Sequence, residues 1–203
     1  MRAAPGEVRI GGGIWKRTPL PVADVPGLRP TPDRVRQTLF NWLGQTLTGW
    51  RCVDAYAGTG ALGFEAASRG ASEVVLVERD PKAVCLLLAA RERLGAEKFV
   101  RVERGDAIAW LARAPAGTFD AVFIDPPFGS NEAVDALVAA ARVVRAGGFV
   151  YVESAECVEA PAAAELEKVR ESRAGSVRFA LFSTPDRGRS RGYTAPRLPE
   201  NTA

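Results

Sequence analysis

The sequence of 203 residues contains no histidine. Its absence excludes the Ser-His and Cys-His arrangements of many hydrolases, histidine metal sites and a histidine general base. Cysteine is scarce as well, because Cys52, Cys85 and Cys157 are far apart and form no CxxC pair. They are too few for a zinc site and indicate no disulfide framework. We therefore expect no metal, and any catalysis must use other side chains.

Long hydrophobic runs are also missing. No apolar stretch approaches the roughly 18–20 residues that cross a bilayer, and the first residues, MRAAPGEVRIGGG, lack the apolar segment of a secretory signal. Hydrophobic residues make up 47% of the sequence and charged residues 25%, which is ordinary for a globular domain. We expect a cytoplasmic protein with one core and no membrane partner.

The net charge is only +3, but the charges are unevenly distributed. Residues 1–38 and 170–203 each hold seven Arg or Lys against three Asp or Glu, whereas residues 39–169 hold thirteen against eighteen. Basic ends around an acidic centre are typical of a protein that binds a nucleic-acid backbone, although solvated surface arginines produce the same pattern. The candidate RNA-contacting residues are Arg29, Arg34 and Arg36, followed by the arginines of residues 187–191.

Three segments are expected from composition. Residues 1–30 carry clustered glycine and proline and predict a basic N-terminal arm or hairpin. Residues 31–184 are expected to form the main domain. Residues 185–203 contain proline, glycine and arginine with little apolar content, which predicts a disordered basic tail.

The main domain begins with a helix signal. Thr31-Pro32-Asp33 predicts a helix start with Thr31 as the N-cap and Pro32 in the first position. An apolar stripe at helical spacing follows, which predicts packing against the core. The stripe consists of Val35, Leu39, Trp42 and Leu43.

From residue 50 the sequence alternates between short apolar runs and helical patterns. Alternation at this spacing predicts parallel strands with right-handed crossovers, a doubly wound α/β sheet. The predicted strands are Cys52–Ala55, Val74–Val77, Val100–Val102, Ala121–Ile124 and Phe149–Val152, and the predicted helices span 62–68, 81–94, 108–111 and 132–144, the last closed by Gly147-Gly148.

The pattern changes near the end. A helix is expected around residues 162–168, and strands 169–172 and 177–183 flank a four-residue turn that contains Gly175. Two strands joined so tightly must be antiparallel. Five parallel strands with a terminal antiparallel hairpin are not the plain dinucleotide-binding arrangement.

A glycine-rich turn joins the first predicted strand to its helix. Gly58, Gly60 and Gly63 fit G-x-G-x-x-G, and Glu78 follows twenty positions after Gly58. Such a turn lets a ligand approach the backbone, and the helix N-terminus favours an acceptor-rich group. The motif fits a dinucleotide equally well, and tight helix packing alone also explains the glycines.

Acidic residues occupy or follow the ends of four predicted strands: Asp54, Glu78, Asp106 and Asp125. Ligands of open α/β sheets bind outside these ends. A row of carboxylates suits a ligand with an amine, a ribose and an adenine amino group, and it suits a pyrophosphate poorly. Glu78 is placed for the ribose hydroxyls and Asp106 for the adenine amine.

The most specific motif is Asp125-Pro126-Pro127-Phe128. The prolines fix the backbone, so the carbonyls and the Asp125 carboxylate become fixed acceptors. Two acceptors can orient the N–H bonds of an exocyclic amine of a base and favour charge that develops on its nitrogen. Phe128 offers a face on which a flipped base can stack.

These motifs resemble those of a known family. The segments DAYAGTGALGFEAASRGA, VERD and DPPF resemble class I S-adenosylmethionine-dependent methyltransferases that act on exocyclic amines. RIGGGIWKRTPL and LRPTPDRVRQTLFNWL narrow the resemblance to RsmD-type methyltransferases, over about residues 8–183. The sequence departs from the family pattern conservatively, at Ala55-Tyr56 and at Phe128.

The resemblance implies a Rossmann-like methyltransferase fold with a seven-stranded, mostly parallel sheet and a C-terminal antiparallel hairpin. It implies S-adenosyl-L-methionine as cofactor and guanine N2 of small-subunit ribosomal RNA as the methylated group, in free RNA or in an assembling ribosomal particle. We expect a monomer. The implied catalytic residues are Asp125, Pro126, Pro127 and Phe128, and the implied cofactor-binding residues are Asp54, Ala57, Gly58, Gly60, Glu78, Arg79, Asp106 and Ala107.

Three other functions stay open on the residues alone. A methyltransferase acting on DNA or on adenine N6 would use the same DPPF motif, although such enzymes usually add a sequence-reading domain. A nicotinamide-dependent oxidoreductase would share the glycine turn but offers no role for DPPF. A catalytically silent RNA-binding module is the third alternative, and the intact DPPF argues against it.

Overall fold

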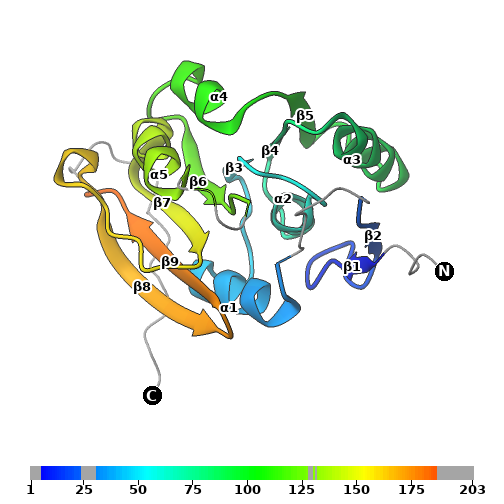
Figure 1. Ribbon diagram of the computed structural model, residues 1–203. Coiled ribbons are helices and arrows are strands. Elements are labelled where there is room, and N and C mark those ends of the chain that lie inside the picture. The colour runs from blue at the N-terminus through cyan, green and yellow to red at the C-terminus, as the bar shows by residue number, and fades with distance from the viewer. Residues whose placement is uncertain (1–5, 24–30, 128–129, 131, 187–203) are drawn as a thin grey trace.

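A computed structural model describes residues 6–23, 31–127, 130 and 132–186 (Figure 1). Its centre is a seven-stranded sheet with the order β5-β4-β3-β6-β7-β9-β8. The first five of these strands are parallel, and β9 and β8 are added antiparallel, as predicted. The strands are β3 Arg51–Asp54, β4 Glu73–Glu78, β5 Val100–Arg104, β6 Phe119–Ile124, β7 Val144–Ser154, β8 Glu167–Ala174 and β9 Val177–Ser183.

Helices cover both faces of the sheet because successive strand side chains point to opposite faces. On β3, Cys52 packs in one core cluster and Val53 in the other. The first cluster contains side chains of α1 (Asp33–Leu43), α2 (Ala61–Ser68) and α3 (Pro81–Arg93). The second contains those of α4 (Ala107–Arg113) and α5 (Glu132–Val143). None of the described helices is long and apolar enough to cross a membrane.

The predicted N-terminal hairpin is present: β1 (Glu7–Arg9) pairs antiparallel with β2 (Pro19–Pro21). Hydrogen bonds attach the segment between these strands to α2 (Figure 1). Gly11 N–H donates to the Glu65 carboxylate at 3.1 Å, and Trp15 N–H donates to Ser68 Oγ at 2.9 Å. A Cβ on Gly13 would lie 1.9 Å from the Ser68 carbonyl oxygen, so only glycine permits this approach.

The predicted helix around residues 162–168 is wrong. Only a single 3₁₀ turn, Ala162–Ala164, forms there, and Glu165 follows it with a φ of 49°. Strand β8 already begins at Glu167, because pairing with β9 along the sheet outweighs the helical propensity of the alanines. Gly147 and Gly148, expected to close α5, instead lie inside β7, which begins directly after that helix.

The predicted cap of α1 is also wrong. The N-cap is Pro32, with φ −56° and ψ 144°, and no side chain caps the helix. Thr31 lies one position earlier, and its hydroxyl donates to a residue far away in the sequence. The start of α1 is therefore fixed by contacts other than a side-chain cap.

Those contacts come from Arg36, which was predicted to contact RNA but is only 2% exposed. Its guanidinium donates to the carbonyls of Thr31 at 2.9 Å and Arg9 at 2.6 Å, and to Asp33 at 2.7 Å. The Glu65 carboxylate lies 3.6 Å away. Arg36 therefore joins the hairpin, the start of α1 and α2, and the prediction that it faces RNA is wrong.

Candidate active site

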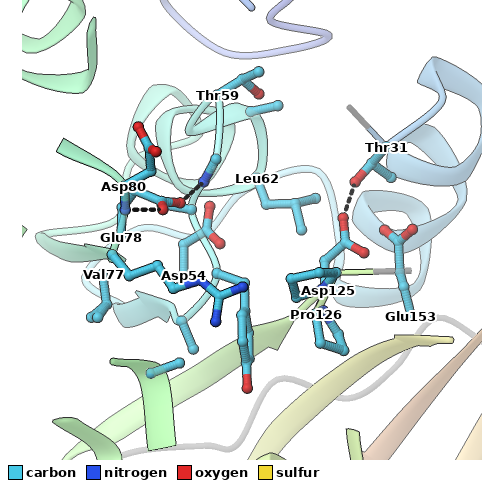
Figure 2. Close-up of a pocket in the computed structure, with 18 of the residues that line it drawn as sticks. Thr31, Asp54, Thr59, Leu62, Val77, Glu78, Asp80, Asp125, Pro126 and Glu153 are labelled. Atoms are coloured by element: carbon cyan, nitrogen blue, oxygen red, sulfur yellow. Dashed lines mark hydrogen bonds between the residues drawn. The ribbon is translucent and has the colours of Figure 1, made fainter. Parts of the chain in front are cut away.

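The predicted ligand site lies at the carboxyl ends of the parallel strands. The chain proceeds outward from β3 to β5 and then returns to β6 on the other side of β3, so the strand order reverses there. Such a reversal opens a crevice in doubly wound sheets. A cavity of about 740 Å³, which we call the main cavity, lies at this point (Figure 2). It is lined by the glycine-rich turn, the ends of β4 and β6, the start of α4 and the turn between β8 and β9.

Glu78 organises the glycine-rich turn. Its carboxylate accepts hydrogen bonds from Gly58 N–H and from Asp80 N–H, both at 2.8 Å (Figure 2). Gly60 has a φ of +74°, and a Cβ there would lie 2.6 Å from the Phe64 ring, so this position requires glycine. A carboxylate has about four lone-pair sites, so Glu78 can still accept from a ligand.

Asp54 ends β3 beneath the same turn and is only 2% exposed. One carboxylate oxygen accepts from Gly63 N–H at 2.9 Å, in the first turn of α2, where the helix dipole favours negative charge. Burial is the largest effect on this group and raises its pKa to about 7, with smaller contributions from Asp125 and Glu78. A cationic ligand group in the cavity would favour the ionised form.

Asp106 caps α4, because one carboxylate oxygen accepts from Ala109 N–H at 2.9 Å. Ala57 and Ala107 are buried and line the main cavity, as do Asp106 and Arg79. The structure therefore places seven of the eight predicted cofactor-binding residues on the wall of one cavity, whereas Gly60, the eighth, is not among the residues that line it.

Asp125 follows β6 on the face of the sheet that α1 covers. Thr31 Oγ1 donates a hydrogen bond of 2.9 Å to Asp125 Oδ2 (Figure 2), although the two residues are 94 positions apart. Burial raises the pKa of Asp125 to about 6, and the Thr31 hydroxyl opposes that shift. Asp125 is therefore mostly ionised at neutral pH, with one oxygen fixed by Thr31.

Glu153 was missed by the sequence analysis. Ile124 pairs with Val152 in the parallel register of β6 and β7, so Asp125 and Glu153 occupy neighbouring positions on the same face. Glu153 is 3% exposed, and its carboxylate accepts from Tyr151 Oη at 3.0 Å. Burial and then the charge of Asp125 raise the pKa of Glu153 well above its ordinary value. A carboxylate at a strand end, the signal that identified the other acids, would have identified this one.

A second cavity of about 370 Å³, which we call the side cavity, adjoins the main one. Asp125, Pro126, Pro127 and Glu153 line both cavities, so the acceptors of the motif stand between two spaces. Ser130 lines the side cavity, and its buried Oγ has no hydrogen-bond partner among the described residues. The side cavity therefore suits a polar occupant.

Some predicted site residues lie outside the described part of the chain. These are Phe128, expected to stack on a base, and Arg29, expected to contact RNA. The arginines of residues 187–191 lie outside it as well, with most of the predicted tail. Arg34 is exposed on α1 and stays a candidate for contact with nucleic acid.

The strand order, the glycine-rich turn and the carboxylates around one cavity are those of a Rossmann-like methyltransferase, and comparisons with known proteins give the same class. The model of the family described as Conserved hypothetical protein 95 matches residues 8–183. The chain belongs to this family, the RsmD family of methyltransferases.

Relatives support the assignment across most of the chain. Ribosomal RNA small subunit methyltransferase D of Escherichia coli (strain K12) is 40% identical over 189 residues, 91% of this chain and 94% of that protein. The protein of the same name from Haemophilus influenzae is 39% identical over 155 residues, 74% of this chain and 80% of its own length. A solved structure from Escherichia coli, named as a candidate methyltransferase, yhhF, is 38% identical with a TM-score of 0.76, covering 89% of this chain and 99% of that one.

Proposed function

We propose that this protein transfers a methyl group from S-adenosyl-L-methionine to the exocyclic N2 amine of a guanine in small-subunit ribosomal RNA. The observation that carries the proposal is the position of Asp125 and Pro126 between two adjoining cavities. A methyl donor and a methyl acceptor need two such spaces that meet at one point. The names of the relatives supply the class of RNA.

The main cavity fits the cofactor by the chemistry of its side chains. The cofactor supplies a methyl group bonded to a positively charged sulfur. Asp54 offers a buried carboxylate to the cationic part of the cofactor, and Glu78 offers lone pairs to its ribose hydroxyls. Asp106 offers the adenine amine the carboxylate oxygen that does not accept from Ala109 N–H. A pyrophosphate would meet negative charge at each of these positions, which disfavours a nicotinamide dinucleotide.

The side cavity is the proposed place of the base. Asp125 and the carbonyl of Pro126, at the boundary between the cavities, accept the two N–H bonds of the amine in the plane of the base. The lone pair of the nitrogen, which is perpendicular to that plane, is then free to face the methyl donor. Ser130 offers its hydroxyl to the polar edge of the base. Phe128 is the proposed stacking surface, on the sequence motif alone.

Asp125 orients the amine and stabilises the charge that develops on it. An aromatic exocyclic amine does not lose a proton to a carboxylate before it reacts, because the two acidities are far apart. Once nitrogen carries the new methyl group and a positive charge, its proton can pass to Asp125, whose pKa of about 6 keeps it ionised at neutral pH. Thr31 keeps the carboxylate in one orientation.

We place the reaction in the cytoplasm, with a monomer as the working form. Arg34, and Arg29 on the sequence alone, are proposed to contact the RNA backbone. So small a domain offers little surface for reading sequence, so we propose that recognition depends on folded RNA and favours an assembling particle over free RNA.

The cofactor is tested by thermal unfolding with S-adenosylmethionine, S-adenosylhomocysteine or NAD. A ligand at 100 times its dissociation constant stabilises by about 2.7 kcal/mol, which is readily detected. We expect a shift with the first two compounds, a smaller one for Glu78→Gln, and none with NAD. A shift with NAD alone would contradict the proposal.

The substrate is tested with a methyl-labelled cofactor offered in parallel to free small-subunit rRNA, small-subunit particles and DNA. We expect label in RNA, with particles labelled faster than free rRNA. Label in DNA and not in RNA would contradict the proposed substrate, whatever the cofactor result.

A further inference from the structure

Acceptors outnumber donors where the two cavities meet. The carboxylates of Asp125 and Glu153 present four oxygens on one face of the sheet, at neighbouring positions of strands about 4.8 Å apart. Within the described ranges, the side chains that donate to them are the hydroxyls of Thr31 and Tyr151. In Figure 2, Asp125, Glu153 and Thr31 lie together on one side of the cavity.

Two buried carboxylates this close are costly without further hydrogen bonds. Burial and the charge of Asp125 raise the pKa of Glu153, so Glu153 retains its proton to higher pH than an exposed carboxylate would. A carboxyl group that keeps its proton for lack of donors favours a ligand that supplies them. A ligand that brings several N–H donors side by side can replace that proton as the partner of the pair. The occupant of this end of the cavity is therefore expected to be rich in adjacent donors.

Guanine is the base with that edge. Its Watson–Crick edge carries the N2 amine next to the N1–H donor, whereas the amines of adenine and cytosine lie next to a ring nitrogen that only accepts. We infer that Glu153 accepts a hydrogen bond from guanine N1–H while Asp125 accepts from the N2 amine, so that Glu153 selects guanine. This inference rests on the proposed function and adds the residue that determines the base.

The position of Glu153 suits this role. Glu153 lines both cavities, and the Tyr151 hydroxyl, from the same strand two residues earlier, donates to one of its carboxylate oxygens. Sites that hydrogen-bond a substrate donor reject analogues that lack it, because the buried acceptor is then left unpaired. Adenine N1 can pair only with a Glu153 that keeps its proton, whereas guanine N1–H pairs with the ionised carboxylate.

The test uses 2-aminopurine, which keeps the N2 amine but has an unprotonated N1. The methylated guanosine is first located by mass spectrometry of rRNA treated with the wild-type protein. Small-subunit particles are then assembled with guanosine or 2-aminopurine at that position, and affinity and single-turnover methylation are measured for both. The variants are Glu153→Gln and, as matched control, Glu167→Gln, whose carboxylate is exposed on β8.

We expect the wild-type protein and Glu167→Gln to prefer guanosine by about 10- to 100-fold, the order of discrimination that a good base contact provides. A side-chain amide can either donate or accept, so Glu153→Gln should reduce this preference to less than about 3-fold in both affinity and rate. The melting temperature of Glu153→Gln should not fall, because glutamine is an uncharged group of the same shape and its amide oxygen can still accept from Tyr151.

Three results would overturn the inference. Equal losses on both bases in Glu153→Gln, with the preference intact, would show that Glu153 only supports the site. Equal methylation of guanosine and 2-aminopurine by the wild-type protein would show that N1–H is not read, while leaving N2 methylation standing. Methylation of adenine by the wild-type protein would instead remove the proposed function together with this inference.

Discussion

The hydrogen bond between Thr31 and Asp125 provides a sharp test of how the carboxylate is controlled. Thr31→Val removes the hydroxyl and keeps a branched side chain of similar size. The backbone should stay in place, because Arg36 donates to the Thr31 carbonyl at 2.9 Å independently of the side chain. Thr31→Ser is the matched control, since it keeps the hydroxyl and loses only a methyl group.

The expected loss of methylation rate in Thr31→Val follows from the strength of this hydrogen bond and its shielding from solvent. Thr31 is 6% exposed, and its hydroxyl lies 2.9 Å from Asp125 Oδ2, so solvent cannot readily replace it. Hydrogen bonds to charged groups contribute about 1.5–3 kcal/mol, which corresponds to about 10- to 150-fold in rate. The hydroxyl lowers the pKa of Asp125, whose value is about 6, so its loss must raise that pKa.

The assay is single-turnover methyl transfer across a range from mildly acidic to mildly alkaline pH. In the wild-type protein the rate should rise with pH as Asp125 ionises, with its pKa of about 6. In Thr31→Val this rise should move to higher pH, so the loss should be largest at the acidic end of the range. Thr31→Ser should follow the wild type. An unshifted profile in Thr31→Val, or equal behaviour of the two variants, would refute the role given to Thr31.

Four further predictions concern charged residues in the site and on α1. Asp125→Asn should lower single-turnover methylation by about 10²–10³ and leave calorimetric cofactor affinity unchanged; near-wild-type turnover would remove Asp125 from the mechanism. Asp54, whose pKa is about 7, ionises as the pH rises through neutrality. Calorimetric affinity for S-adenosylmethionine, which carries a positive sulfur, should therefore increase with pH more than affinity for S-adenosylhomocysteine, whose sulfur is uncharged. Asp54→Asn should abolish this difference between the two compounds. Arg36→Met should lower the free energy of unfolding, measured with denaturant, by about 3–5 kcal/mol, because the buried Glu65 loses one of its cationic neighbours and the carbonyls of Thr31 and Arg9 lose their donor. Arg34→Glu should leave that free energy unchanged and flatten the salt dependence of RNA binding.

Strand-end positions were predictable because they follow from local sequence. Each apolar run that predicts a parallel strand is followed closely by a carboxylate, and the two-residue period of a strand determines which face of the sheet that carboxylate occupies. The sequence analysis placed Asp54 and Asp125 at strand ends from such runs, without assigning either to a face. Glu153 follows the fifth run by the same rule, so the signal for it was present in the sequence.

Arg36 was misjudged because charged residues are usually exposed. Its spacing contained the opposite signal, since Leu39, Phe40 and Leu43 lie three, four and seven positions later and are all buried. A guanidinium on that stripe needs buried partners from other parts of the chain. The Arg9 carbonyl accepts a hydrogen bond from it, and the Glu65 carboxylate lies 3.6 Å away as an opposite charge. Those partners are tertiary, so the sequence alone does not show them.

The contact of Thr31 with Asp125 was beyond reach for the same reason, because it joins residues 94 positions apart. Locally, Thr31 has the sequence of an N-cap, and only the docking of α1 onto the ends of the strands directs its hydroxyl to Asp125. The helix prediction for residues 162–168 was wrong for a similar reason, since pairing with strand β9 determines the conformation of the end of that segment.

The most direct test of the central claim is the identity of the methylated nucleoside. Small-subunit particles lacking the modification are incubated with the protein and methyl-labelled S-adenosylmethionine, and the RNA is digested to nucleosides and analysed by mass spectrometry. We expect a single labelled product, N2-methylguanosine, with label lost in Asp125→Asn. Label in N6-methyladenosine, or undiminished label in Asp125→Asn, would contradict the central claim.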